Sequence, residues 1–233
     1  MRIPGFPGAV FGVCAVLFAA ASVMAAPPAS LPPATTDDLR WEESITAFTS
    51  ADRENAPSPG GVVFIGSSSI RLWSDLESQL RVPRAVINRG FGGARLSDCT
   101  KYLDRLVFPH APRLIIVYAG DNDLAEGREP TDVANEFVRF VERVRKALPA
   151  TRIAYISIKP SPARAGLIPK IRETNQLILQ FITASDNLNF IDVFTPMLDH
   201  GGHPRAELFR ADALHLNSAG YQLWATIIGP HVR

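Results

Sequence analysis

Residues 62–70 read Val62-Val63-Phe64-Ile65-Gly66-Ser67-Ser68-Ser69-Ile70, and this stretch decides the fold. Its four leading apolar residues predict a short buried strand, because a continuous apolar run bounded by turn residues is typical of a strand covered on both faces. The glycine and the serines predict a turn. From Ile70 to Leu80 the apolar residues are spaced as in a helix. The stretch is therefore expected to form a strand, a turn and a helix, the opening unit of an α/β fold.

The same alternation continues to the end of the chain. Further buried strands are expected at Ala85–Asn88, Leu114–Tyr118, Ile153–Ile158 and Phe190–Val193. Helices are expected at Leu96–Leu106, Thr131–Leu148, Ile168–Thr183 and Ser218–Ile228. Strands that alternate with helices predict a parallel sheet with helices on both faces, that is, a three-layer α/β/α sandwich.

The N-terminus is predicted to be a secretory signal peptide, residues 1–25. Arg2 provides the positive region, an apolar run extends from Ala9 to Ala21, and Val23-Met24-Ala25 is a cleavage context that ends in a small residue. The alternative is an uncleaved membrane anchor, but the run is shorter than the roughly 20 residues that a bilayer span needs. We therefore expect a secreted or periplasmic protein without a stable membrane span after cleavage.

Two further regions follow the signal peptide. Residues 26–60 are expected to comprise a linker rich in Pro and Ala, Ala26–Thr36, and a helix within Asp37–Asn55 that packs on the main domain. A cluster of Pro and Gly ends this helix. Residues 61–233 are expected to form the main domain.

Composition excludes some classes of partner. Lys and Arg number 24 and Asp and Glu number 23, so no net field favours nucleic acid or an anionic membrane. Cys14 lies in the apolar run of the signal peptide, which leaves Cys99 as the single cysteine after cleavage. One cysteine cannot form an internal disulfide, and Cys99 is expected to be a small buried apolar residue.

Four polar or glycine-rich clusters follow predicted strands. They are Gly66-Ser67-Ser68-Ser69, Gly90-Phe91-Gly92-Gly93, Gly120-Asp121-Asn122-Asp123 and, after a loop, Asp212-Ala213-Leu214-His215. In open parallel sheets ligands bind outside the carboxyl ends of the strands, so the four clusters are expected to converge on one edge.

Each cluster has a structural interpretation and a chemical one. A serine at a strand-to-helix turn is a helix cap or an exposed nucleophile. A glycine turn is only a turn, or it lets a backbone N–H approach a reacting oxygen. Asn122 is a turn residue or an amide donor. Asp212 and His215, three residues apart, share a face if that turn is helical, and the carboxylate then orients the imidazole. Taken together, the four favour an active site.

These clusters resemble the conserved blocks of the SGNH (GDSL-type) hydrolase family. The resemblance rests on Phe64-Ile65-Gly66-Ser67-Ser68-Ser69-Ile70, Asn88-Arg89-Gly90-Phe91-Gly92-Gly93, Gly120-Asp121-Asn122-Asp123 and Asp212-Ala213-Leu214-His215-Leu216-Asn217, in this order. It covers the chain from about Gly61 to the C-terminus. The resemblance implies a flavodoxin-like five-stranded parallel sheet and makes residues 61–233 an SGNH hydrolase domain.

The resemblance also implies a role for individual residues. Ser68 would be the nucleophile, and Asp212 and His215 would complete a catalytic triad. The N–H groups of Gly93 and Ser68 and the amide of Asn122 would form the oxyanion hole. The implied activity is that of a secreted serine esterase on small-molecule, carbohydrate or lipid esters, with no cofactor and no metal.

Several points stay open at this level. The family usually has Asp before the nucleophile, where this chain has Ser67. An acyltransferase on the same serine and a non-catalytic binding module of the same fold are the alternatives. His200 and His203 are interpreted as loop residues, or at most as the lining of a pocket, because two imidazoles without ordered ligand spacing are a weak metal signal. Lys159–Arg164 is expected to line the mouth of the pocket, where Arg164, like Arg95, would meet an anionic group if it is not simply solvated.

Export gives the first testable prediction. Because the predicted cleavage follows Ala25, mass spectrometry of the protein secreted by its native host should find a mature N-terminus near Ala26. An intact Met1 on protein recovered from the cytosol would contradict the prediction.

Overall fold

A five-stranded parallel sheet forms the centre of the molecule. The computed structural model describes Met1 and residues 40–233, so the predicted signal peptide and linker lie outside the described residues. The strands are β1 (Val62–Gly66), β2 (Val86–Gly90), β3 (Leu114–Tyr118), β4 (Arg152–Ile156) and β5 (Leu188–Ile191). Their order is β2-β1-β3-β4-β5, and all four pairings are parallel. This is the flavodoxin-like order, so the predicted α/β fold and sheet are confirmed.

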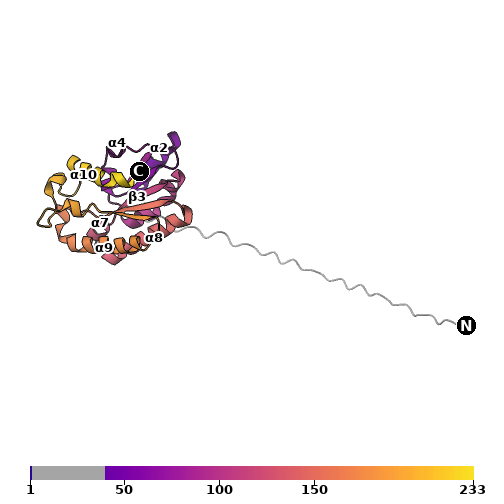
Figure 1. Ribbon diagram of the computed structural model, residues 1–233. Coiled ribbons are helices and arrows are strands. Elements are labelled where there is room, and N and C mark those ends of the chain that lie inside the picture. The colour runs from indigo at the N-terminus through magenta and orange to yellow at the C-terminus, as the bar shows by residue number, and fades with distance from the viewer. Residues whose placement is uncertain (2–39) are drawn as a thin grey trace. The chain divides into compact units, whose positions relative to one another are not determined.

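Helices cover both faces of the sheet (Figure 1). They are α2 (Glu42–Glu54), α3 (Ser68–Arg71), α4 (Leu76–Leu80), α5 (Leu96–Lys101), α6 (Leu103–Leu106), α7 (Asp121–Ala125), α8 (Pro130–Ala147), α9 (Ile168–Thr183) and α10 (Ser218–Ile228). Short 3-10 turns occur at Phe108–His110, Pro162–Leu167, Thr195–Met197, Ala206–Leu208 and Gly229–His231. Figure 1 shows α8 and α9 on one side of β3 and α10 on the other.

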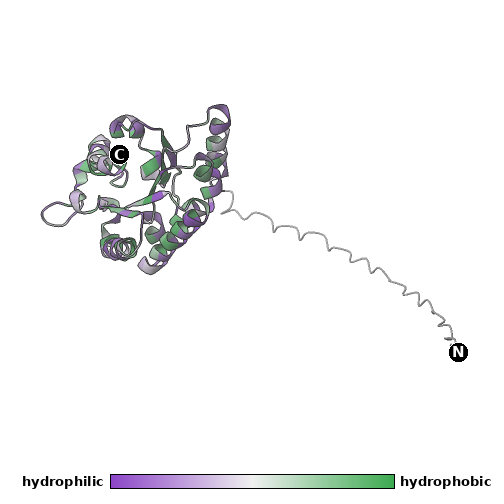
Figure 2. Cartoon of the chain, turned by 45° about the vertical axis from the view of Figure 1, so that its right-hand side comes forward, coloured by the Kyte–Doolittle hydropathy of each residue, from purple (hydrophilic) through white to green (hydrophobic). Residues whose placement is uncertain are grey.

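Alternating strand residues build two separate cores. Val63 and Ile65 of β1 pack in one core with α2, α5, α6, α8 and α9, whereas Val62 and Phe64 pack in the other with α3, α4 and α10. Because successive side chains of a strand point to opposite faces, one apolar run supplies both cores. The helices are amphipathic, and both hydropathy colours appear on them in Figure 2.

Helix α8 shows how sequence spacing determines this packing. Its buried residues are Pro130 and the five apolar residues that share one helical face, namely Val133, Phe137, Phe140, Val141 and Val144. Pro130 occupies the first turn, where its missing N–H costs nothing, and the carboxylate of Asp132 accepts the N–H of Glu129 at the N-cap. Burial of each large apolar side chain contributes about 1.5–3 kcal/mol, so the face as a whole fixes the helix on the sheet.

Two predicted helices are interrupted. The helix expected over Ile70–Leu80 breaks between α3 and α4, where the Trp73 ring is buried in a stack with Tyr221, with ring centroids 5.3 Å apart. The helix expected over Leu96–Leu106 breaks between α5 and α6 at Tyr102, whose ring meets Phe91 edge to face. In both places burial of an aromatic ring against a distant residue overrides the local helical spacing.

Three strands end two residues away from their predicted C-terminal ends. Strand β2 extends two residues beyond Asn88, to Gly90. Strand β4 ends at Ile156, two residues early, because the N–H of Ile158 donates to the side chain of Asn175. Strand β5 ends at Ile191 rather than Val193, because the N–H of Val193 donates to the hydroxyl of Ser157 instead of a neighbouring strand. A side-chain acceptor replaces the sheet in the last two cases, which apolar patterning does not reveal.

The N-terminal helix packs on the main domain, as expected. It begins at Glu42, and the residues before Arg40 in the predicted helix lie outside the described ones. Ile45 is fully buried in the core, and the carboxylate of Glu42 accepts two hydrogen bonds from Arg105 of α6, at 2.7 and 2.9 Å. Helix α2 is thus fixed by apolar burial and by an ion pair.

Two further sequence expectations concern Cys99 and the surface. Cys99 is fully buried, as predicted, and burial raises the pKa of its thiol.

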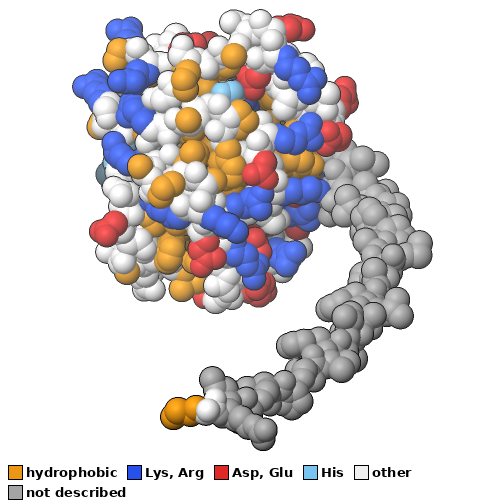
Figure 3. Space-filling view, turned by 90° about the vertical axis from the view of Figure 1, so that its right-hand side faces the viewer, with side chains coloured by type: hydrophobic (Ala, Val, Ile, Leu, Met, Phe, Trp, Pro, Cys, Tyr) orange, Lys and Arg blue, Asp and Glu red, His pale blue; other side chains and the backbone are white. Residues whose placement is uncertain are grey.

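On the face drawn in Figure 3, Lys and Arg side chains are interspersed with Asp and Glu side chains. Within residues 40–233, no helix is long and apolar enough to cross a membrane.

Candidate active site

Ser68 stands where β1 gives way to α3. Gly66 ends the strand at a point where a Cβ atom would lie 2.1 Å from the carbonyl oxygen of Tyr118, so only glycine fits. Ser68 is then the first residue of α3 and is partly exposed, whereas Ser67 and Ser69 are completely buried. Ser67 occupies the N-cap position, but its side chain makes no cap hydrogen bond. The helix-cap interpretation of the serines is therefore wrong for Ser67.

The loop before α10 holds His215 against Asp212. One carboxylate oxygen of Asp212 accepts the backbone N–H groups of Leu214 and His215, at 3.0 and 2.9 Å, and the other lies 2.7 Å from Nδ1 of His215. The turn is not helical, because Ala213 has a φ of 55° in the left-handed region. Carboxylate hydrogen bonds to the backbone, rather than a shared helical face, thus bring the two side chains together.

The same imidazole reaches the serine. Nε2 of His215 lies 3.0 Å from Oγ of Ser68, although 147 positions separate the two residues. The hydrogen bonds from His215 and from the backbone hold the pKa of Asp212 well below its ordinary value, so this carboxyl is ionised at neutral pH. Serine, imidazole and carboxylate therefore form a continuous hydrogen-bonded series, with the imidazole in the middle.

The glycine turn after β2 leaves the backbone N–H groups of Gly92 and Gly93 without an acceptor among the described residues. Gly93 has a φ of 78°, a conformation that favours glycine, and among the described residues its N–H has no acceptor. The carbonyl oxygen of the preceding Gly92 accepts a hydrogen bond of 2.8 Å from the indole Nε1 of Trp41, just before α2. The sequence alone did not associate Trp41 with the site, because the two residues are far apart in the chain.

The amide of Asn122 has a fixed orientation. Nη2 of Arg164 lies 2.9 Å from one amide atom and the carbonyl oxygen of Ala94 lies 3.0 Å from the other. Arginine only donates and a carbonyl only accepts, so the atom facing Arg164 is Oδ1 and the atom facing Ala94 is Nδ2. Nδ2 carries two hydrogens and uses one on Ala94. The other remains available to a ligand.

A buried charge cluster lies behind Asn122. Asp121 is almost fully buried, 3.2 Å from Nζ of Lys159 and 3.1 Å from Arg164. Burial would raise the pKa of Asp121, but the two cations hold it below its ordinary value. Lys159 was expected at the mouth of the pocket and is instead buried in this cluster, because its charge is paired there. Arg164 contacts the site, as expected, but its partners are protein groups.

Arg95 is also paired within the protein. Its guanidinium contacts the carboxylates of Asp98, at 3.0 Å, and Glu126, at 3.6 Å. The sequence allowed two interpretations, a solvated side chain or one that binds an anionic ligand. The structure shows neither, because Arg95 is paired with carboxylates of the protein.

Asp123 connects the segment after β3 to the start of α5 through hydrogen bonds. Its two carboxylate oxygens lie 3.2 and 3.3 Å from the backbone nitrogen of Leu96. Burial raises the pKa of Asp123 to about 7, against the opposing effect of that N–H. The side chain of Trp41 donates to the carbonyl of Gly92, and that of Asn122 donates to the carbonyl of Ala94. With the bond to Leu96, three side chains therefore hold the short loop between β2 and α5.

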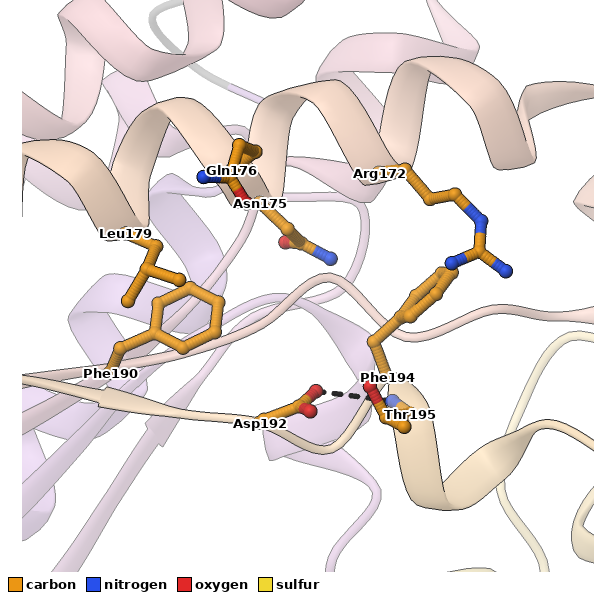
Figure 4. Close-up of a pocket in the computed structure, with 8 residues that line it drawn as sticks. All are labelled: Arg172, Asn175, Gln176, Leu179, Phe190, Asp192, Phe194 and Thr195. Atoms are coloured by element: carbon orange, nitrogen blue, oxygen red, sulfur yellow. Dashed lines mark hydrogen bonds between the residues drawn. The ribbon is translucent and has the colours of Figure 1, made fainter.

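A separate pocket lies between α9 and the end of β5 (Figure 4). Its lining residues are Arg172, Asn175, Gln176, Leu179, Phe190, Asp192, Phe194 and Thr195. None of the predicted site residues belongs to it. Asn175 is engaged with the backbone of Ile158, and Asp192 accepts the N–H of Thr195, so these polar groups serve local structure.

The histidines of the loop after β5 remain on the surface. His200 and His203 are exposed, and Nδ1 of His203 lies 3.5 Å from the carboxylate of Asp199. Within residues 40–233 there is no group of three or more His, Cys, Asp or Glu side chains arranged to hold a metal ion.

The fold and this site define a class of protein. A flavodoxin-like sheet with a Ser–His–Asp series at its carboxyl edge is the architecture of an SGNH-type hydrolase. The chain belongs to the GDSL-like lipase/acylhydrolase family, whose family model matches residues 43–223. A search of curated proteins gave no match.

Solved structures with the same fold come from several bacteria. A protein from Streptococcus pneumonia, described as a candidate platelet activating factor, superposes with a TM-score of 0.75 at 24% identity, covering 84% of this chain and 94% of its own. A GDSL-like lipase from Bacteroides thetaiotaomicron gives 0.66 at 19% identity, with coverages of 83% and 95%. A lipase/acylhydrolase from Enterococcus faecalis gives 0.59 at 20% identity, with coverages of 74% and 95%. These similarities establish the fold.

Asp123 predicts a pH-dependent stability. Its pKa is about 7 in the folded protein and near 4 when unfolded, so between these values the folded state holds a proton that the unfolded chain releases. The free energy of unfolding should therefore fall as pH rises from about 4 to 7, by at most roughly 1.4 kcal/mol per pH unit. Asp123→Asn cannot ionise and should lack this decline.

Thermal unfolding from about pH 4.5 to 8 measures the effect. Asp186→Asn, a change at an exposed carboxylate, is the matched control and should follow the unmodified protein. Parallel curves for Asp123→Asn and the unmodified protein would show that Asp123 is not the responsible group.

Proposed function

We propose that this protein is an esterase that hydrolyses carboxylic esters through an acyl-enzyme on Ser68. One observation carries the proposal: Nε2 of His215 lies 3.0 Å from Oγ of Ser68 while Nδ1 lies 2.7 Å from Asp212. This is the geometry required for proton transfer from a serine that attacks a carbonyl carbon.

The proposed reaction has two halves. In the first, Oγ of Ser68 attacks the ester carbonyl, His215 takes the serine proton, and the tetrahedral intermediate collapses as His215 gives that proton to the leaving alcohol. In the second, water attacks the acyl-enzyme while His215 takes its proton, and His215 then gives that proton to Oγ of Ser68 as the acyl–oxygen bond breaks and the acid is released. Asp212 stabilises the imidazolium in both halves.

Backbone and side-chain donors would stabilise the oxyanion. The N–H of Gly93 has no acceptor among the described residues, and Asn122 has one amide hydrogen left after its bond to Ala94. The N–H of Ser68 has no intrahelical acceptor either, since α3 begins there. These donors are the ones that the family resemblance implies, and their free hydrogens support this role.

The proposal names only a class of substrate and a class of location. We propose a small-molecule, carbohydrate or lipid ester as substrate and a secreted or periplasmic protein. A chain-length series of p-nitrophenyl esters measures the acyl preference. Release of acid without an added acceptor alcohol distinguishes hydrolysis from acyl transfer.

Ser68→Ala should abolish ester hydrolysis while the melting temperature stays close to that of the unmodified protein. The change removes one partly exposed hydroxyl and little packing. Ser67→Ala and Ser69→Ala are matched controls, because both hydroxyls are buried and unpartnered among the described residues. Both should keep activity. An inactive Ser67→Ala variant beside an active Ser68→Ala variant would move the nucleophile to Ser67.

Asn122→Ala should lower kcat by about 100- to 1000-fold with KM nearly unchanged, because its donor bond strengthens as the oxygen gains charge. Steady-state kinetics on active-site-titrated enzyme measure this, together with the melting temperature. The variant also loses the bonds to Ala94 and Arg164, so some loss of stability is expected. A folded variant with unchanged kcat would remove Asn122 from the mechanism.

A further inference from the structure

The peptide unit between Gly92 and Gly93 is contacted on the side opposite its free N–H. The indole Nε1 of Trp41 donates a hydrogen bond of 2.8 Å to the carbonyl oxygen of Gly92. That carbonyl and the N–H of Gly93 belong to one planar trans peptide and point in opposite directions. The bond from Trp41 therefore fixes the plane in which the Gly93 N–H lies.

The same bond also strengthens the donor. A hydrogen bond to a peptide oxygen draws electron density from nitrogen through the partial double bond, and serial hydrogen bonds polarise one another by about 10–30%. The N–H of Gly93 thus becomes a better donor to an anionic oxygen. Asn122 has the corresponding arrangement, because Arg164 donates to Oδ1 of the amide whose Nδ2 keeps a free hydrogen.

Trp41 is held firmly enough to act in this way. Its side chain is almost fully buried and meets the ring of Phe91 edge to face, with centroids 5.8 Å apart. The guanidinium of Arg40 covers the ring at 4.4 Å. The Trp41 carbonyl also accepts the N–H of Ile45, at 2.9 Å, which links the residue to the first turn of α2.

We propose that Trp41 is a positioning residue for the oxyanion hole, acting through the Gly92–Gly93 peptide. This inference rests on the proposed function, because it assigns Trp41 to the same site. Trp41 precedes the residues that match the family model, so the N-terminal segment of this chain supplies the contact. The competing explanation is that Trp41 only anchors α2 on the domain.

The test removes the indole N–H and keeps an aromatic ring. Trp41→Phe keeps a ring against Phe91 and has no donor for Gly92. Replacement of Trp41 by benzothienylalanine, in which sulfur takes the place of the N–H, is the closer match in shape. We expect kcat for p-nitrophenyl acetate to fall about tenfold in both, less than for loss of a whole oxyanion donor, with KM within roughly twofold. Affinity for phenylboronic acid, which forms a tetrahedral anion on serine, should fall in parallel.

Two control variants loosen α2 without touching this hydrogen bond. Ile45→Ala removes a fully buried side chain, and Glu42→Gln weakens the ion pair to Arg105. Both should lower the melting temperature and leave kcat unchanged. An equal loss of kcat in these variants would assign Trp41 a purely structural role and overturn the proposal. Unchanged kcat and boronate affinity in the benzothienylalanine protein would overturn it as well.

A spectroscopic measurement separates this proposal from the proposed function. Polarisation of the peptide by Trp41 changes the shielding of the Gly93 amide nitrogen, so its ¹⁵N chemical shift should move in the benzothienylalanine protein. An unmoved Gly93 resonance contradicts the role of Trp41 whatever the activity. Absence of ester hydrolysis by the unmodified protein contradicts the esterase proposal, and the oxyanion-hole role of Trp41 with it, even if the resonance moves.

Discussion

The parallel pairing of β1 with β2 and β3 is the constraint on which the site depends. In this register Gly66 lies opposite both Gly90 and Tyr118, so three strands end at the same level. Parallel strands direct all their carboxyl ends to one edge of the sheet. Ser68 lies two residues beyond that level, Gly93 three beyond it and Asn122 four. A slip of one residue in either pairing would separate the proposed nucleophile from the proposed oxyanion donors.

Hydrogen bonds at the strand ends extend this register into the loops. The N–H of Ser67 donates to Tyr118, and the N–H of Phe91 donates to Gly66, at 3.0 and 2.9 Å. The close approach of Gly66 to Tyr118 leaves no space for a Cβ atom, so the glycine permits the pairing to continue to the edge. The turns that carry Ser68 and Gly93 therefore begin from fixed backbone positions rather than from free loops.

Sequence patterning predicted the elements well and the contacts between them poorly. The strand at Leu114–Tyr118 and the helices at Ile168–Thr183 and Ser218–Ile228 have the predicted bounds, because each is a strong apolar pattern with clear boundary residues. The contact of Trp41 with Gly92 joins residues 51 positions apart, and no local pattern reports it. A tryptophan in a segment otherwise rich in charge was the available signal. The burial of Lys159 could not be predicted from the sequence for the same reason. A charge is buried only where it has a partner, and here the partner, Asp121, comes from another loop.

The charged side chains around Asn122 bear on the proposed catalysis. Burying Asp121 and Lys159, with Arg164 partly buried beside them, costs desolvation energy, so these groups are a poor means of gaining stability. The carboxylate of Asp121, however, holds the guanidinium of Arg164 in place. From there Arg164 donates to Asn122, and this hydrogen bond permits only one orientation of the amide. A donor that is oriented when the protein folds need not reorient when negative charge develops on the substrate. Water molecules must reorient at that point, so a preorganised dipole stabilises the charge better than water does. Trp41 does the same for the Gly92–Gly93 peptide with a neutral donor. The two proposed oxyanion donors are thus oriented from behind by groups of different charge, a guanidinium for Asn122 and a neutral indole for the Gly92–Gly93 peptide.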